Sequence, residues 1–139
     1  MTVSYTGIWP VAPTPFHEDG SLDLEGMKRV LDCLIDQGAD GICILANFSE
    51  QFLLADDERE ILMRLCIEHI AGRVPVIVTT SNYATKIAVE RAQFAKGLGA
   101  DIVMMMPPYH GALLKGSPQQ TYDQFKAVGE VGIPIMVQD

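Results

Sequence analysis

Residues 43–50 read Cys-Ile-Leu-Ala-Asn-Phe-Ser-Glu, and the organisation of the chain can be inferred from this stretch. It begins as an apolar run and ends in mostly polar residues just before a new helical pattern. A short apolar run between helical patterns is typical of a strand that is buried on both faces, as in a parallel sheet. In such α/β folds, ligands bind at the carboxyl ends of the strands. The stretch therefore predicts a parallel sheet with a candidate site at its carboxyl edge.

Strand and helix patterns alternate along the rest of the chain. Strands are expected at residues 7–12, 41–46, 74–78, 101–106 and 133–137. Helices are expected to begin near Asp23, Ala55, Thr85 and Ser117, and to end at Gly38, Gly72, Gly97 or Gly99, and Gly132. Four times a helix ends at glycine and an apolar strand follows within one to three residues, which predicts a parallel sheet of right-handed βα units.

The helix patterns also predict caps and buried faces. Asp23 is the expected N-cap of the first helix, and the run Ser117-Pro118-Gln119-Gln120 combines an N-cap, a proline at N1 and a glutamine at N3. The expected buried face of the second helix is Ile61, Leu62, Leu65, Cys66 and Ile70. In the fourth helix it is Tyr122, Phe125 and Val128.

Two α/β architectures fit this order, a five-stranded doubly wound domain and part of a (β/α)₈ TIM barrel. No strand is followed by a glycine-rich phosphate-binding loop, and every strand ends in polar or aromatic residues, which favours the barrel. A complete barrel takes about 250 residues, so 139 residues are expected to form just over half of one. The prediction is that residues 1–139 are the N-terminal portion of a single barrel, about four and a half βα units with no internal domain boundary.

Composition excludes several classes of protein. The net charge of −8 argues against nucleic-acid binding, and no apolar stretch is long enough to span a membrane. Residues 1–4 lack the features of a signal peptide, so a cytoplasmic location is expected. The cysteines Cys33, Cys43 and Cys66 form no paired motif and are expected to be buried free thiols, and no residues are spaced as metal ligands.

Several motifs resemble one enzyme family across residues 7–139. These motifs are Pro13-Thr14-Pro15-Phe16, Gly72-Arg73-Val74-Pro75-Val76-Ile77, Gly99-Ala100-Asp101 and Pro108-Tyr109. They resemble the dihydrodipicolinate synthase / N-acetylneuraminate lyase family, whose members are (β/α)₈ enzymes. The resemblance implies a Schiff base between a lysine and a 2-keto acid.

Three further stretches, at residues 44–52, 107–112 and 133–139, are similar to a dehydratase branch of this family. That branch converts a 2-keto-3-deoxy pentonate to 2,5-dioxopentanoate. The commoner family pattern has paired hydroxyl residues after the second strand and a tyrosine after the fifth, whereas this chain has Ala46-Asn47-Phe48-Ser49-Glu50 and Gln138. An amide cannot act as an acid or base near neutral pH, so the proton-transfer chemistry must have moved.

The resemblance implies roles for seven residues. His110 and Tyr109 are the catalytic candidates, since imidazole is a good proton shuttle near pH 7. The candidates for substrate binding are Thr14, Asn47, Phe48, Ser49 and Gln138. We interpret Glu50 as structural, although it could be a general base.

The imine lysine of the family lies on the sixth strand, beyond Asp139, so no dissociable cofactor is expected and the fragment alone should be inactive. The expected partners are a small 2-keto-3-deoxy acid and, by resemblance, further copies of the enzyme in a homotetramer. A synthase or aldolase acting on another 2-keto acid is the alternative activity. A non-catalytic half-barrel that serves as a binding or assembly module is the alternative of another class.

Overall fold

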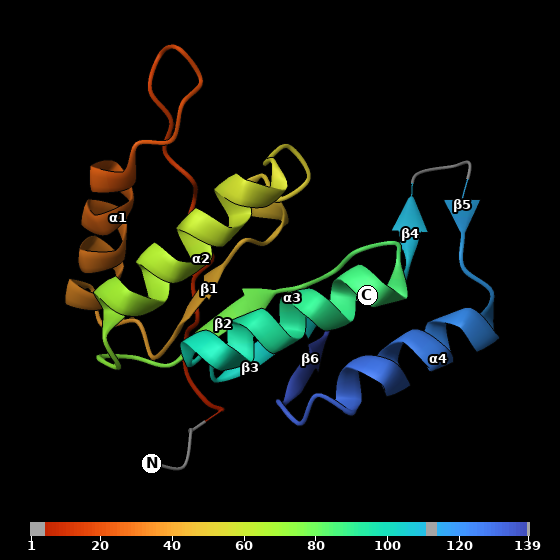
Figure 1. Ribbon diagram of the computed structural model, residues 1–139. Coiled ribbons are helices and arrows are strands. Elements are labelled where there is room, and N and C mark those ends of the chain that lie inside the picture. Colours follow the sequence, from red (N-terminus) through yellow and green to blue (C-terminus); the bar gives the residue numbers. More distant parts are fainter. Residues whose placement is uncertain (1–4, 111–113, 139) are drawn as a thin grey trace. The chain divides into compact units, whose positions relative to one another are not determined.

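The computed structural model of the protein describes residues 5–110 and 114–138. By its internal contacts the chain falls into two compact units, Met1–Val78 and Thr79–Asp139. Figure 1 shows the elements of both units coloured along the sequence.

The first unit combines a parallel pair of strands with two helices. Its elements are α1 (Leu24–Asp36), β1 (Ile42–Ile44), the 3₁₀ helix η1 (Asn47–Ser49), α2 (Asp56–Ile70) and all but the last residue of β2 (Val76–Thr79). β1 and β2 pair in parallel with Ile42 opposite Val76 and Ile44 opposite Val78. α1 and α2 pack against each other. A parallel pair joined by a helix is the βα arrangement that the sequence predicts.

The strand expected at residues 7–12 is reduced to a single bridge. Val11 pairs in parallel with Cys43, and the flanking hydrogen bonds run from Cys43 N to Pro10 O and from Ala12 N to Cys43 O. The segment thus follows the edge of β1 as a parallel strand would. Pro10 has no N–H to donate to a ladder, which is why regular strand structure does not extend here.

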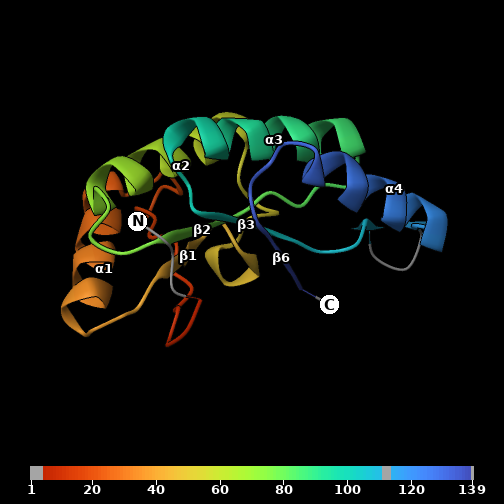
Figure 2. The same cartoon turned by 90° about the horizontal axis from the view of Figure 1, so that it is seen from below.

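The second unit repeats the same construction. Its elements after β2 are α3 (Thr85–Leu98), β3 (Ile102–Met105), β4 (Tyr109–His110), β5 (Leu114–Lys115), α4 (Pro118–Gly129) and β6 (Ile135–Val137). β3 and β6 pair in parallel, with Met105 opposite Val137, whereas β4 and β5 form a short antiparallel hairpin that the sequence did not predict. α3 and α4 lie side by side on one side of β3 and β6 (Figure 2).

The predicted helix caps are confirmed. Asp23 Oδ1 accepts a hydrogen bond from Gly26 N over 2.7 Å at the start of α1. At the start of α4, Ser117 Oγ accepts from Gln120 N over 3.2 Å, and Gln120 Oε1 accepts from Ser117 N over 2.8 Å. Both arrangements satisfy backbone N–H groups that a helix terminus leaves without partners.

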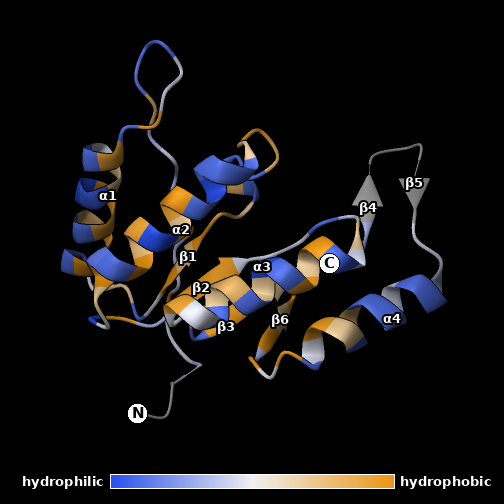
Figure 3. Ribbon diagram, viewed as in Figure 1, coloured by the Kyte–Doolittle hydropathy of each residue, from blue (hydrophilic) through white to orange (hydrophobic). Residues whose placement is uncertain are grey.

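β1, β2 and β3 are buried along their whole length, as the sequence predicts, and Figure 3 shows them as continuous apolar segments. β6 differs, because Ile135 is half-buried and both Met136 and Val137 are exposed. No helix among the residues that the structure describes is long and apolar enough to cross a membrane.

The predicted faces of two helices need correction. In α2, Ile61 is 46% exposed and Leu65 only half-buried, whereas Arg59 and Met63 lie on the buried face with Leu62. The buried face of α2 is therefore rotated from the predicted one. It consists of five residues at helical spacing: Arg59, Leu62, Met63, Cys66 and Ile70.

In α4, Tyr122 is 63% exposed, and Phe125 is half-buried. Gln124 occupies the buried side together with Val128. Gln124 is buried because it forms hydrogen bonds there: its Nε2 donates to Asn82 O over 3.1 Å and to Tyr83 O over 3.4 Å. A pattern of hydrophobic residues does not predict such a role.

Candidate active site

The segment after β1 turns sharply and carries most of the candidates for substrate binding. Leu45 and Glu50, on either side of η1, both have left-handed backbone conformations, with φ of 57° and 60°. Residues other than glycine, asparagine and aspartate seldom adopt this conformation, because their Cβ crowds the backbone. Such strained residues are characteristic of functional loops whose surroundings fix their conformation.

Two buried hydrogen bonds brace this turn against the segment that precedes α1. Ser49 Oγ donates to Ala12 O over 2.6 Å, and Thr14 Oγ1 donates to Ser49 O over 2.8 Å. Both side chains are buried. The structure therefore brings two predicted site residues together, and each has committed its hydroxyl proton to a backbone carbonyl.

Within η1, Asn47 and Phe48 are exposed. Phe48 is 70% exposed, so it does not belong to the core of the described structure. Asn47 Oδ1 accepts a hydrogen bond from Gln51 Nε2 over 2.8 Å, and the backbone oxygen of Gln51 accepts from Arg59 Nη1, also over 2.8 Å. A carboxamide and an aromatic ring are thus presented beyond the carboxyl end of a buried parallel strand, where α/β folds bind ligands.

In the second unit, the remaining candidates follow β3 and β6. Gln138 is exposed, and its backbone N–H donates to Met105 O over 2.9 Å, which places it beside the end of β3. Tyr109 and His110 form β4 just beyond the end of β3, pairing with Lys115 and Leu114. The side chains of Tyr109 and His110 lie outside the described part of the structure.

The ends of these strands are held by polar residues that sequence analysis did not single out. Ser81 Oγ accepts from Met106 N over 2.9 Å, and Arg91 Nη1 donates to Ser81 O over 2.9 Å. Together with Gln124, which binds the same loop, they fix the segment after β2 to its neighbours. For Arg59 a signal did exist: it lies three and four residues before Leu62 and Met63, which places it on their face of α2.

No lysine lies in any of the four described parallel strands. Lys28 is in α1, Lys86 and Lys96 are in α3, and Lys126 is in α4, while Lys115 is in β5. Within residues 5–110 and 114–138, no group of three histidine, cysteine or acidic side chains is arranged to hold a metal ion. The strand ends thus present amide, hydroxyl and aromatic groups.

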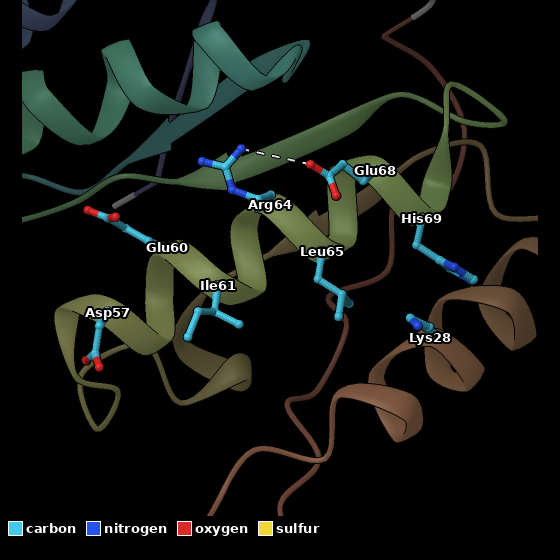
Figure 4. A pocket seen from close by; sticks show the side chains of 8 residues that line it. All are labelled: Lys28, Asp57, Glu60, Ile61, Arg64, Leu65, Glu68 and His69. Atoms are coloured by element: carbon cyan, nitrogen blue, oxygen red, sulfur yellow. Dashed lines mark ion pairs between the residues drawn. The ribbon is translucent and has the colours of Figure 1, made fainter.

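A hollow of the first unit lies over α1 and α2 (Figure 4). It is lined by Lys28, Asp57, Glu60, Ile61, Arg64, Leu65, Glu68 and His69. All of these side chains come from the helices and none from a strand end. Charges of both signs are interspersed here, so the hollow has no single chemical preference.

His69, which lines this hollow, has a structural role. Its Nε2 lies 2.9 Å from Asp32 Oδ1, and Arg73 donates to the same oxygen over 2.8 Å. The hydrogen bond from Arg73, with a further contribution from His69, lowers the pKa of Asp32. The cluster ties α1 to the end of α2.

The cysteines are free thiols, as predicted, but they are not all buried. Cys43 and Cys66 are buried, whereas Cys33 is exposed on α1 and accepts a hydrogen bond from Gln37 Nε2. Burial raises the pKa of the Cys66 thiol to about 12. Cys66 is therefore not an activated nucleophile, since an activated thiol has a lowered pKa.

Comparison with known proteins agrees with this description. The sequence model of the dihydrodipicolinate synthetase family matches residues 4–139. An L-2-keto-3-deoxyarabonate dehydratase from Azospirillum brasilense is 53% identical over 99% of this chain and 45% of its own length. A 4-hydroxy-tetrahydrodipicolinate synthase from Polynucleobacter asymbioticus is 37% identical over 94% of this chain and 42% of its own. The chain therefore spans about half the length of these curated relatives.

A solved structure shows the same fold. The E. coli K12 prophage protein YagE, of the dihydrodipicolinic acid synthase family and solved in complex with pyruvate, superposes with a TM-score of 0.89. The two are 33% identical, and the match covers 96% of this chain and 44% of that one. The βα units described above are therefore part of a (β/α)₈ barrel, as the sequence predicts.

Proposed function

Because the chain belongs to the dihydrodipicolinate synthetase family, we propose that the protein is a lyase acting on a 2-keto-3-deoxy sugar acid. Specifically, we propose that it dehydrates L-2-keto-3-deoxyarabonate to 2,5-dioxopentanoate. The observation that carries this proposal is the 53% identity to a dehydratase of that specificity, against 37% to a synthase over a similar span.

The residues at the strand ends support a dehydratase over a synthase. Asn47 and Phe48 stand where the commoner family pattern has hydroxyl residues, and Gln138 stands in place of a tyrosine. With the hydroxyl protons of Thr14 and Ser49 donated to backbone carbonyls, the exposed carboxamide of Asn47 is the group of this turn suited to orient a substrate hydroxyl.

The proposed reaction begins with an imine between a lysine amine and the C2 ketone, a step that releases water. The iminium acidifies C3, a base removes a C3 proton, and the C4 hydroxyl leaves with a proton as water. Removal of a C5 proton and return of a proton to C3 give the enol of the C5 aldehyde. Tautomerisation and hydrolysis of the imine release 2,5-dioxopentanoate and the lysine, so the net change is the loss of one water.

In this scheme the side chains have distinct parts. His110, adjacent to Tyr109 in β4, would carry one or more of the proton transfers, because its ordinary pKa lies near neutrality. Asn47 and Gln138 would hold the sugar hydroxyls by hydrogen bonds, and Phe48 would form a wall. The lysine would come from beyond Asp139, since the described parallel strands carry none. We propose further that no dissociable cofactor takes part, and that the enzyme is a cytoplasmic homotetramer.

Borohydride trapping tests the proposal on the complete translation product of the gene. The protein is incubated with 2-keto-3-deoxy-L-arabonate, reduced, and analysed by intact mass, while NMR follows the small molecules. A lysine adduct together with 2,5-dioxopentanoate is the expected result. An adduct with pyruvate but no dehydration would indicate a synthase or aldolase, and no adduct with either compound would refute the Schiff base.

A further inference from the structure

We propose that Gln51 is a positioning residue that fixes the orientation of the Asn47 carboxamide, and that Arg59 in turn fixes Gln51. The inference rests on the proposed function, in which Asn47 orients a substrate hydroxyl. Gln51 is only 3% exposed, and its Nε2 donates to Asn47 Oδ1 over 2.8 Å. A buried side chain thus holds one end of an exposed one.

The contact determines which end of Asn47 is offered to a ligand. A carboxamide has an oxygen that accepts and an NH₂ group that donates, and rotation by half a turn exchanges them. With Oδ1 engaged by Gln51, the NH₂ group is the end directed away from that contact. Asn47 would therefore act as a donor toward a sugar hydroxyl or carboxylate oxygen. Loss of Gln51 removes this hold on Oδ1, so part of the population would present the oxygen in place of the NH₂ group.

Arg59 links this contact to the first turn of α2. The contacts from Arg59 through Gln51 to Asn47 are called the relay below. Its side chain is 3% exposed, and its Nη1 donates to the backbone oxygen of Gln51 over 2.8 Å. A buried guanidinium requires polar partners, because desolvation of a charge is costly. Since α2 is a rigid element of 15 residues, this bond fixes the backbone from which the Gln51 side chain projects.

The position of Gln51 also has a cost in stability. Its Oε1 is buried, and among the described residues this atom has no hydrogen-bond partner. An apolar side chain of similar shape would avoid such an unsatisfied acceptor. Gln124 Oε1, in the second unit, is buried without a partner among the described residues in the same way, so the two glutamines carry the same cost and differ in what their Nε2 groups bind.

A double-mutant cycle on the complete translation product tests the relay. The variants are Gln51→Met, which keeps the length of the side chain but not the donor, Asn47→Ala, and their combination. Gln51→Met should lower kcat/KM for 2-keto-3-deoxy-L-arabonate about tenfold, which equals a coupling of about 1.4 kcal/mol and lies within the range for residues in contact. In the Asn47→Ala background the same change should have almost no effect. Equal losses in both backgrounds would overturn the proposal.

Gln124→Met is the matched control. Gln124 is as buried as Gln51 and also holds a loop, but its Nε2 binds backbone oxygens in the second unit. Any loss that it causes should therefore add to that of Asn47→Ala. If Gln51→Met does not fold, Gln51→Leu replaces it in the cycle, because it is also apolar and cannot donate.

A second readout separates this inference from the proposed function. If the unmodified enzyme turns over no 2-keto acid, the proposed function is refuted. The contact between Gln51 and Asn47 can still be tested, by NMR of protein labelled with ¹⁵N at asparagine. Gln51→Met should shift the side-chain NH₂ resonances of Asn47, whereas Gln124→Met should leave them in place. Unchanged Asn47 resonances in the Gln51 variant would refute the contact itself.

Discussion

Replacing Ser49 by alanine should destabilise the protein far more than the loss of one hydroxyl at the surface would. The hydroxyl donates to Ala12 O over 2.6 Å in the interior. The variant removes that donor and leaves a carbonyl oxygen in a region that water does not reach. An unsatisfied buried polar group costs about 1–3 kcal/mol. The folding equilibrium constant should therefore fall by about 5- to 150-fold.

Urea unfolding followed by circular dichroism measures this loss, and Ser21→Ala is its matched control. Ser21 Oγ also donates over 2.6 Å, to Asp19 Oδ1, but this hydrogen bond is exposed, so the control should change stability by less than about 0.5 kcal/mol. Thr14→Val should also destabilise, because its hydroxyl donates to Ser49 O. Both hydrogen bonds join Ser49 to the segment before α1, so the two effects should not be strictly additive. A Ser49→Ala protein as stable as the Ser21→Ala protein would refute the assignment of these bonds as a brace.

Three further predictions follow from other parts of the chain. In the native protein a thiol reagent at pH 8 should modify Cys33 and spare Cys66, whose pKa is raised to about 12, and mass spectrometry of the labelled peptides checks this. Arg73 and His69 lower the pKa of Asp32, so this carboxylate stabilises the fold fully above about pH 4, the ordinary pKa of an aspartate. Its contribution is lost as the pH falls through the lowered pKa. Asp32→Asn should therefore make the free energy of unfolding depend less on pH in the acid range, as a series of urea titrations at different pH would measure. Ser117→Ala should reduce the free energy of unfolding by about 0.5–2 kcal/mol through loss of the α4 N-cap, as measured by urea titration.

Local sequence patterns predicted the helix caps and the buried strands well, because each of these features depends on a few residues that are close together in sequence. Asp23 caps α1 as expected, since a short acceptor three residues before a backbone N–H needs no tertiary partner. The buried strands were equally readable, because a parallel strand covered on both faces is apolar throughout. The family and the partial barrel followed from motifs and from this regular order, and both predictions are confirmed.

The predicted buried faces of the helices were wrong where a polar side chain occupies an interior position. Tyr122 was expected in the core of α4, but Gln124 is buried instead, because it binds the backbone of a distant loop. Arg59 displaced Ile61 from the buried side of α2 for a similar reason. Hydrophobic periodicity cannot weigh hydrogen bonds whose partners lie far away in sequence.

At the candidate site, too, the positions of the residues were predictable from the sequence, whereas their long-range hydrogen bonds were not. Sequence placed Asn47, Phe48 and Ser49 at the end of a strand, and the structure agrees with that placement. It could not reveal that the hydroxyl of Ser49 donates to a residue 37 positions earlier. The roles of His110, Tyr109 and Gln138 stay predictions.

The braced turn after β1 has a consequence for affinity. Thr14 and Ser49 hold it from one side, and Arg59 holds it from the other through Gln51. The conformational entropy of ordering this loop is therefore lost when the chain folds, before any ligand arrives. A ligand that contacts Asn47 meets a preorganised surface, so more of its interaction energy remains as binding free energy. Weakening the brace would thus loosen binding even where every atom that touches the ligand is left unchanged.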